Sequence, residues 1–163
     1  MELYIECTNA GSNLAIGRMG MHYLEGEGLE KDVGKGLEML ERAGRKGDGG
    51  ALYYLGCSYR DGNGVEQDFK KAVAYLKRSA GRKEPSACEA LGDIYSTDEY
   101  GLHSARKAAK WYLKGARMGG QGCMAKTSRM YSEGILTRKD EAKARMWNER
   151  FLDMDSKIYG YER

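Results

Sequence analysis

The sequence predicts an all-α fold, an α-solenoid of stacked antiparallel helix pairs. The chain of 163 residues repeats itself every 36 residues without a gap. Apolar residues within each repeat recur at the spacing of a helix face, and no alternation with a period of two persists. One helix pair cannot bury its own apolar side, so consecutive pairs are expected to stack on one another.

Six columns of equivalent positions carry the repeat. In order they hold a small residue, a glycine, a tyrosine, a helix-capping residue, a lysine and a large side chain. The members are Ala15, Ala51, Ala87 and Cys123; Gly20, Gly56, Gly92 and Ser128; Tyr23, Tyr59, Tyr95 and Tyr131; Asp32, Asp68, Ser104 and Asp140; Lys35, Lys71, Lys107 and Lys143; Met39, Tyr75, Trp111 and Trp147.

The columns define one repeat domain, residues 1–163, with four complete units. The units are 11–46, 47–82, 83–118 and 119–154. Residues 1–10 fit the register of a second helix, so they are expected to form a half-repeat helix that could pair with another subunit. Residues 155–163 are expected to form a C-terminal tail.

Each unit is expected to contain two helices. In the second unit, Ala51, Leu55 and Tyr59 form the apolar stripe of the first helix. Gly62 and Gly64 end it, because glycine accepts the left-handed backbone of a helix stop. The capping column then starts the second helix. A glycine inside the first helix costs roughly 1 kcal/mol relative to alanine, so its recurrence predicts a close approach of two helices.

The lysine column lies in the first turn of each second helix, where the helix dipole disfavours a cation. The lysine stems are therefore expected to cover apolar neighbours while the ammonium groups stay in water. A row of partner-binding lysines is the alternative. The tyrosine column, with Trp111 and Trp147, is expected to pack between helices in preference to stacking on bases.

Composition indicates a folded, globular chain, with 41% hydrophobic and 31% charged residues. No apolar run approaches the roughly 20 residues of a membrane span, and none resembles a signal-peptide core. We therefore expect a cytoplasmic protein, or a periplasmic or secreted one if a leader was removed. The cysteines, Cys7, Cys57, Cys88 and Cys123, form no CxxC pair and are expected to be reduced, packed thiols.

The pattern A-x-x-x-L-G-x-x-Y-x-x-G-x-G-V-x-x-D-x-x-K-A resembles the Sel-one-like repeat (SLR), a relative of the tetratricopeptide repeat. The second unit carries it almost completely, in Ala51, Leu55, Gly56, Tyr59, Gly62, Gly64, Val65, Asp68, Lys71 and Ala72. The resemblance implies a superhelix that acts as an adaptor or scaffold for other proteins, in bacteria above all. A cysteine-rich subgroup has been proposed to bind or cleave β-lactams, but its recurring cysteine pair is missing from this sequence.

By analogy with tetratricopeptide stacks, unpacked side chains of the first helices are expected to line a concave groove. We predict partner-binding residues at Arg18, Met21 and Leu24; Tyr53, Tyr54, Cys57 and Arg60; Glu89 and Asp93; Lys126 and Arg129. Aromatic and guanidinium groups are enriched in binding hot spots. No catalytic residue, metal ligand or cofactor is predicted, because the chain lacks a G-x-S-x-G or S-x-x-K nucleophile motif and the usual zinc spacings.

Charge is divided unevenly along the chain. Residues 1–103 hold 13 basic and 17 acidic side chains, whereas residues 104–150 hold 12 basic and 4 acidic ones. This asymmetry would steer an acidic partner toward the third and fourth units. A solvated face of two amphipathic helices explains the same numbers equally well.

The leading hypothesis is a non-enzymatic adaptor that grips a peptide segment or helix of a partner protein. Its variant is an immunity or inhibitor protein that neutralises a bacterial toxin. Nucleic-acid binding through residues 104–150 is less favoured, because the formal net charge is only +3 and no RNA-binding module is present. Hydrolysis of a β-lactam or cell-wall fragment, and scaffolding by self-association, are the remaining alternatives.

Overall fold

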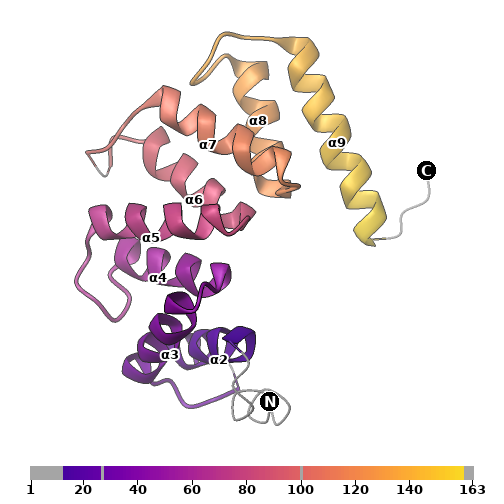
Figure 1. Cartoon of the computed structure of the whole chain (residues 1–163). Coiled ribbons are helices and arrows are strands. Elements are labelled where there is room, and N and C mark those ends of the chain that lie inside the picture. Colours follow the sequence, from indigo (N-terminus) through magenta and orange to yellow (C-terminus); the bar gives the residue numbers. More distant parts are fainter. Residues whose placement is uncertain (1–12, 27, 100, 160–163) are drawn as a thin grey trace. The chain divides into compact units, whose positions relative to one another are not determined.

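The computed structural model describes residues 13–26, 28–99 and 101–159 (Figure 1). These residues form eight α-helices and no β-strand, as the sequence predicts. The helices are α2 (Asn13–Glu25), α3 (Val33–Arg45), α4 (Gly49–Asp61), α5 (Phe69–Gly81), α6 (Pro85–Ser96), α7 (Ala105–Arg117), α8 (Gln121–Glu133) and α9 (Glu141–Tyr159). The expected half-repeat at residues 1–10, and the self-association based on it, lie outside the described residues. None of the described helices has both the length and the apolarity needed to cross a membrane.

The helices pack as consecutive pairs, α2 with α3, α4 with α5, α6 with α7 and α8 with α9. Contacts divide the chain into two compact units, one ending at Glu84 and the other starting at Pro85. Each unit holds two helix pairs, and within each unit the two first helices touch, α2 with α4 and α6 with α8. The last helix, α9, continues past residue 154, where the periodicity of the sequence ends.

The glycine column marks the closest approach between the two helices of a pair. A Cβ atom added to Gly20 would lie 2.9 Å from the carbonyl oxygen of Gly36, and one added to Gly56 would lie 2.6 Å from Cγ of Leu76. At Gly92 the atom would lie 2.3 Å from the Tyr112 ring. The predicted close approach is therefore confirmed, because a side chain at these positions would overlap the opposite helix.

Every second helix starts with the same set of contacts. The side chain of the capping residue accepts a hydrogen bond from the backbone N–H of the column lysine, at 2.9 to 3.4 Å. The backbone N–H of the capping residue donates to the carbonyl of the column tyrosine, at 2.8 to 3.0 Å. The lysine ammonium lies 4.2 to 5.3 Å from the centroid of that tyrosine ring. The pairs are Tyr23–Lys35, Tyr59–Lys71, Tyr95–Lys107 and Tyr131–Lys143.

These contacts explain why a cation is kept in the first turn of a helix. The lysine covers an aromatic face with its charge exposed, and the attraction between ammonium and ring offsets the unfavourable helix dipole. The expected packing role of the lysine stems and tyrosine rings is thus confirmed. Trp147 is buried in the core at 4% exposure, whereas Trp111 is half-buried.

The caps predict a loss of stability in acid. The backbone N–H of Lys71 lowers the pKa of Asp68, and the ammonium and backbone N–H of Lys143 lower the pKa of Asp140. Because the folded pKa lies below the unfolded one, this stabilisation is complete above the ordinary aspartate pKa of 3.8 and is lost as pH falls through the folded pKa.

The variant Asp68→Asn, Asp140→Asn keeps a capping oxygen without the charge. We expect its free energy of unfolding, measured by urea titration from about pH 5 to about pH 2, to fall less steeply than that of the parent. Equal slopes would show that the two carboxylates contribute nothing to acid sensitivity.

Thr127 occupies a core position at which other repeats carry Met19, Leu55 and Leu91. Its side chain is 0% exposed, and its hydroxyl has no hydrogen-bond partner among the described residues. Valine has the same shape without the hydroxyl, so we expect Thr127→Val to raise the free energy of unfolding by about 1 kcal/mol. Urea denaturation would check this, with Thr127→Ser as a control that keeps the hydroxyl and loses stability. A less stable valine variant would contradict the burial of an unpaired hydroxyl.

Candidate functional site

A pocket of about 230 Å³ in the first unit lies between α2 and α4. Tyr53, Tyr54, Cys57 and Arg60 of α4 line it, and Leu24 of α2 closes it. The four α4 residues share a face, because positions three, four and seven apart lie above one another on a helix. The two tyrosine rings meet edge to face, with centroids 5.3 Å apart. The structure therefore brings together all four predicted residues of the second repeat.

The phenol and the thiol of this pocket are neutral, and its guanidinium is paired. Burial raises the pKa of both Tyr53 and Cys57, so the phenol and the thiol remain neutral. The Arg60 guanidinium donates two hydrogen bonds to Asp61, at 2.7 and 2.8 Å, and this pairing raises the pKa of the guanidinium further. The pocket thus offers aromatic surface and a held cation, without an activated nucleophile.

The predicted residues of the first repeat are arranged differently. Leu24 lines the pocket, but it is only 3% exposed and belongs to the core of the unit, so it offers a partner little surface. It packs against α3, where a Cβ added to Gly36 would lie 3.0 Å from its Cγ. Arg18 is exposed and Met21 half-buried on α2, and neither lines the pocket.

A second pocket, of about 510 Å³, lies in the other unit between α6 and α8. Asp93, Lys126 and Arg129 line it, together with Tyr112 of α7. The Lys126 ammonium lies 2.5 and 2.7 Å from the two carboxylate oxygens of Asp93 and 3.0 Å from Oε1 of Glu89. The Tyr112 hydroxyl donates to Asp93 at 2.7 Å. The predicted residues Glu89, Asp93 and Lys126 therefore form one ionic cluster.

The cluster carries a net negative charge beside an exposed cation. Burial on its own lowers the pKa of Lys126, but hydrogen bonds from its ammonium to Asp93 and Glu89 outweigh burial and raise it. The group stays cationic and neutralises one of the two carboxylates. Arg129 is exposed and pairs with Glu133 at 2.9 Å. A ligand in this pocket would therefore meet one carboxylate, of Glu89 or Asp93, whose charge is not neutralised. It would also meet the Arg129 guanidinium, whose exposed ion pair with Glu133 contributes little and is easily exchanged.

The two pockets occupy equivalent places in their units. Tyr54 and Lys126 hold the same repeat position, as do Cys57 and Arg129. Sequence reasoning missed the remaining lining residues. They are the helix residues Glu25, Ser58, Asp61, Ser96, Tyr112 and Met130 and the loop residues Asn63, Ile135 and Leu136. One signal was available, since Ile135 is an apolar residue in a loop, and it proves to be 45% exposed.

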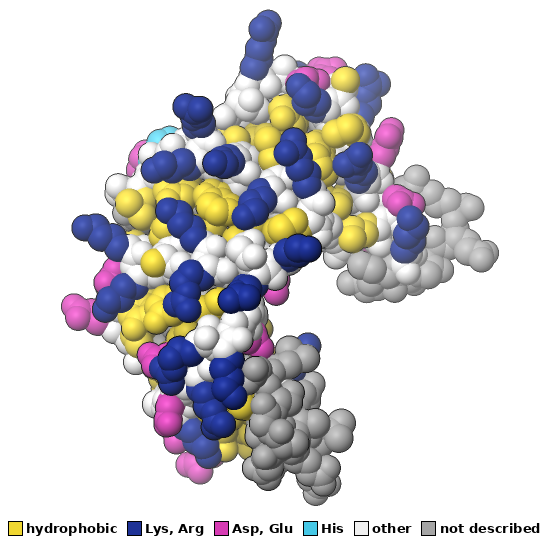
Figure 2. Space-filling model, viewed as in Figure 1, with side chains coloured by type: hydrophobic (Ala, Val, Ile, Leu, Met, Phe, Trp, Pro, Cys, Tyr) yellow, Lys and Arg dark blue, Asp and Glu magenta, His cyan; other side chains and the backbone are white. Residues whose placement is uncertain are grey.

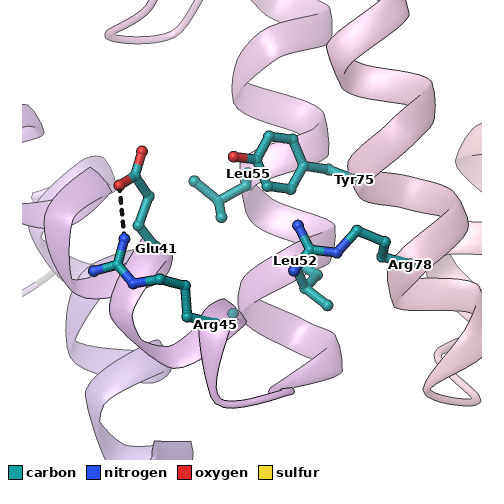
Figure 3. A pocket seen from close by; sticks show the side chains of 7 residues that line it. Glu41, Arg45, Leu52, Leu55, Tyr75 and Arg78 are labelled. Atoms are coloured by element: carbon teal, nitrogen blue, oxygen red, sulfur yellow. Dashed lines mark hydrogen bonds and ion pairs between the residues drawn. The ribbon is translucent and has the colours of Figure 1, made fainter.

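A smaller pocket, of about 210 Å³, lies on the second-helix side of the first unit (Figure 3). Arg45 of α3 and Arg78 of α5 flank it, and Leu52 lies between them. Arg45 pairs with Glu41 at 3.3 Å, and Arg78 lies over the ring of Tyr75 at 5.6 Å. Its wall is basic and partly neutralised.

Groups that suit metal binding do not gather in the described ranges. The cysteines in these ranges are thiols, with Cys88 and Cys123 in the core and Cys57 half-buried. Burial raises the pKa of Cys123 to about 12. These thiols are packed as the sequence predicts.

Comparison with known proteins gives a consistent picture. The model of the Sel1 repeat matches residues 14–48, 50–82, 85–120 and 122–155. None of the curated proteins matches the sequence significantly. Among solved structures, the chain is similar to a Sel1 repeat protein from Oxalobacter formigenes, with 27% identity and a TM-score of 0.82. That alignment covers 93% of this chain and 62% of the other.

Two further structures show the same fold at lower identity. A protective antigen of uropathogenic Escherichia coli with an SLR fold has 24% identity and a TM-score of 0.81, over 95% of this chain and 33% of that one. An immunity protein from Pseudomonas aeruginosa has 20% identity and a TM-score of 0.60, over 95% and 73%. This chain thus covers less than two thirds of the length of the first two proteins, 62% of one and 33% of the other.

Proposed function

Because the chain belongs to the Sel1 repeat family, we propose that it is a non-enzymatic adaptor that binds a segment of a partner protein on its first helices. The observation that supports this proposal is the pair of equivalent pockets, one in each unit, between consecutive first helices. Sel1 repeat proteins generally mediate protein–protein interactions, and a repeated pocket suits a ligand that is itself a chain.

The chemistry of the pockets favours side-chain recognition. Tyr53 and Tyr54 offer rigid amphipathic surface, and Arg60 a guanidinium already oriented by Asp61. Such aromatic and arginine groups supply most of the energy in protein interfaces. In the other unit, Arg129 would attract a carboxylate and the Asp93 cluster a cation. The Cys57 thiol and the Tyr53 phenol of the first pocket, and the Tyr112 phenol of the second, have raised pKa values, which argues against nucleophilic catalysis.

Affinity capture with matched variants tests the proposal. The bait would be the parent chain beside Arg60→Glu, Arg129→Glu, which reverses one cation in each pocket. The control Lys70→Glu, Lys77→Glu changes the net charge equally on exposed positions of α5. We expect a protein captured by parent and control to be lost from the pocket variant, provided that circular dichroism shows all three folded. Equal capture by all three would place binding outside the pockets.

The captured protein would also separate the adaptor from the immunity alternative. The likeness to the Pseudomonas aeruginosa immunity protein, at 20% identity, carries the fold only. If the captured protein is a toxin, and the parent chain blocks its activity at equal molar amounts, the pockets would serve to inhibit that toxin. A partner without such an activity would support the adaptor.

A further inference from the structure

We propose that the outer face of α7 is a second docking groove, which takes an acidic amphipathic helix of a partner protein. The groove measures about 950 Å³ and is formed by α7 together with the loop that precedes α9. We call it the α7 groove. Arg60 and Arg129, which are changed in the capture experiment, do not line the α7 groove. Binding to the two pockets and binding to the α7 groove can therefore be tested separately.

The rim of the α7 groove is basic. Arg106, Lys110, Lys114 and Arg117 line it, at spacings of four, four and three residues that align them along one side of a helix. Helix α7 contains no acidic residue. Among the described residues, none of these four cations forms an ion pair with a carboxylate. Their charge is therefore available to a ligand, and it complements an acidic one.

One of the four cations, Lys114, is held in place by an aromatic ring. Lys114 lies over the ring of Trp111, 4.9 Å from its centroid, and both side chains are half-buried. A cation held by a ring loses less side-chain freedom when it pairs with a ligand. Figure 2 shows Lys and Arg side chains with hydrophobic side chains between them on the face in view.

The centre of the α7 groove is apolar. Ala109, Leu113 and Met118 line it from the helix side, and Leu136 lines it from the loop. Among the four complete units the apolar centre belongs to the third alone, because the position of Leu113 is Glu41, Lys77 and Glu149 in the other three. In the first unit, Glu41 lines the smaller basic pocket shown in Figure 3. The third repeat therefore has an apolar side chain, Leu113, where the other complete units have a charged one, and an amphipathic ligand requires such an apolar contact.

Leu136 provides an independent observation. Its φ is +62°, in the left-handed region that leucine adopts at a cost, whereas Gly28 and Gly64 hold the equivalent position at +71° and +77°. A strained residue kept at a glycine position points to a role for its side chain. Leu136 lines both the α7 groove and the neighbouring Asp93 pocket, so its side chain supplies apolar surface to two binding sites.

The shape and lining favour a helix over the other anionic ligands. A lipid bilayer is flat and would leave a concave, apolar floor unfilled. Proteins that bind single-stranded nucleic acid stack its bases on aromatic side chains, and no aromatic side chain lines the α7 groove. A helix with leucines on one face and glutamates beside them matches both the apolar centre and the basic rim.

The test uses the full chain and a labelled, helix-forming peptide. The peptide has leucine at i, i+3, i+4 and i+7 and glutamate at the flanking positions, and its control has lysine in place of glutamate. We expect the acidic peptide to bind by fluorescence anisotropy and the basic one not to bind. The affinity should fall as salt is raised from about 50 to 200 mM, as expected of charge pairing.

The decisive variant is Lys110→Glu, Leu113→Glu. The first repeat already carries glutamate at both equivalent positions, Glu38 and Glu41, so the helix tolerates these residues. We expect affinity to fall about tenfold or more, while the control Lys70→Glu, Lys77→Glu, on exposed positions of α5, binds like the parent. Lys110→Ala, Lys114→Ala provides a second variant if the first does not fold, with the same expected loss.

Three outcomes would overturn the proposal. The first is that the parent does not bind the acidic peptide, or that the variants bind it equally well. The second is that Leu113→Glu alone leaves affinity unchanged, which would reduce the groove to a patch of charge. The third is that an oligothymidine strand, or vesicles of phosphatidylcholine and phosphatidylserine, displace the peptide and bind more tightly through Lys110 and Lys114.

Discussion

Gly56→Ala is expected to lower the free energy of unfolding by about 1–3 kcal/mol, although alanine is the better helix former. The new Cβ atom would lie 2.6 and 2.8 Å from Cγ and Cδ2 of Leu76 and 3.3 Å from the carbonyl oxygen of Ala72. Leu76 is fully buried and cannot turn away without disturbing the core. Urea denaturation followed by circular dichroism measures the effect.

Gly81→Ala is the matched control. Gly81 is the last residue of α5, and nothing lies within 4 Å of the position its Cβ would take. Here the propensity of alanine acts without a clash, so we expect a gain between zero and about 1 kcal/mol. Gains of equal size in both variants would mean that the glycine column does not mark a contact between helices.

Leu76→Ala is expected to cost about 2–5 kcal/mol, because it removes a fully buried side chain and leaves a cavity. The same cavity lies where the Cβ of Gly56→Ala would go. The double variant Gly56→Ala, Leu76→Ala should therefore lose less stability than the sum of the two single variants, with a favourable coupling of about 1 kcal/mol or more. A double-mutant cycle by urea denaturation measures this coupling. Strict additivity would contradict the contact.

The repeat itself made much of the fold predictable. The offset of 36 residues placed the helix pairs, and the capping column placed the start of each second helix. The recurrence of glycine inside a helix, unfavourable on its own, could only be explained by close packing. The opposite helix supplies a different group in each unit, a backbone carbonyl at Gly20 and a tyrosine ring at Gly92. The same position of the repeat therefore contacts a different group of the opposite helix in each unit.

The charges of the candidate site were harder to predict. Lys126 pairs with Asp93, a residue 33 positions earlier, and such a pair exists only when one repeat stacks on the next. Arg60 pairs with its neighbour Asp61, although adjacent residues on a helix do not normally face each other. This pair forms where α4 ends and Gly62 turns the chain with φ at +71°. The repeat predicted where these charged residues lie on the helices. Their ion-pair partners, in contrast, depend on how the loops run and on how the repeats stack.

The basic face of α7 was visible in the sequence only as an excess of charge over residues 104–150. Its grouping with Leu136 required the path of the loop between α8 and α9. A comparison of equivalent positions would have drawn attention to Leu113, because among the four complete units it is the only apolar residue at that position.

Site-specific photo-crosslinking in the source cells tests whether a partner protein lies on the first helices. A photoreactive phenylalanine would replace Tyr54 in one variant, Arg129 in a second and the exposed Lys77 of α5 in a third. We expect adducts with one and the same protein from the positions of Tyr54 and Arg129, and none from that of Lys77. Adducts from Lys77 alone, or different proteins from the two pockets, would contradict it.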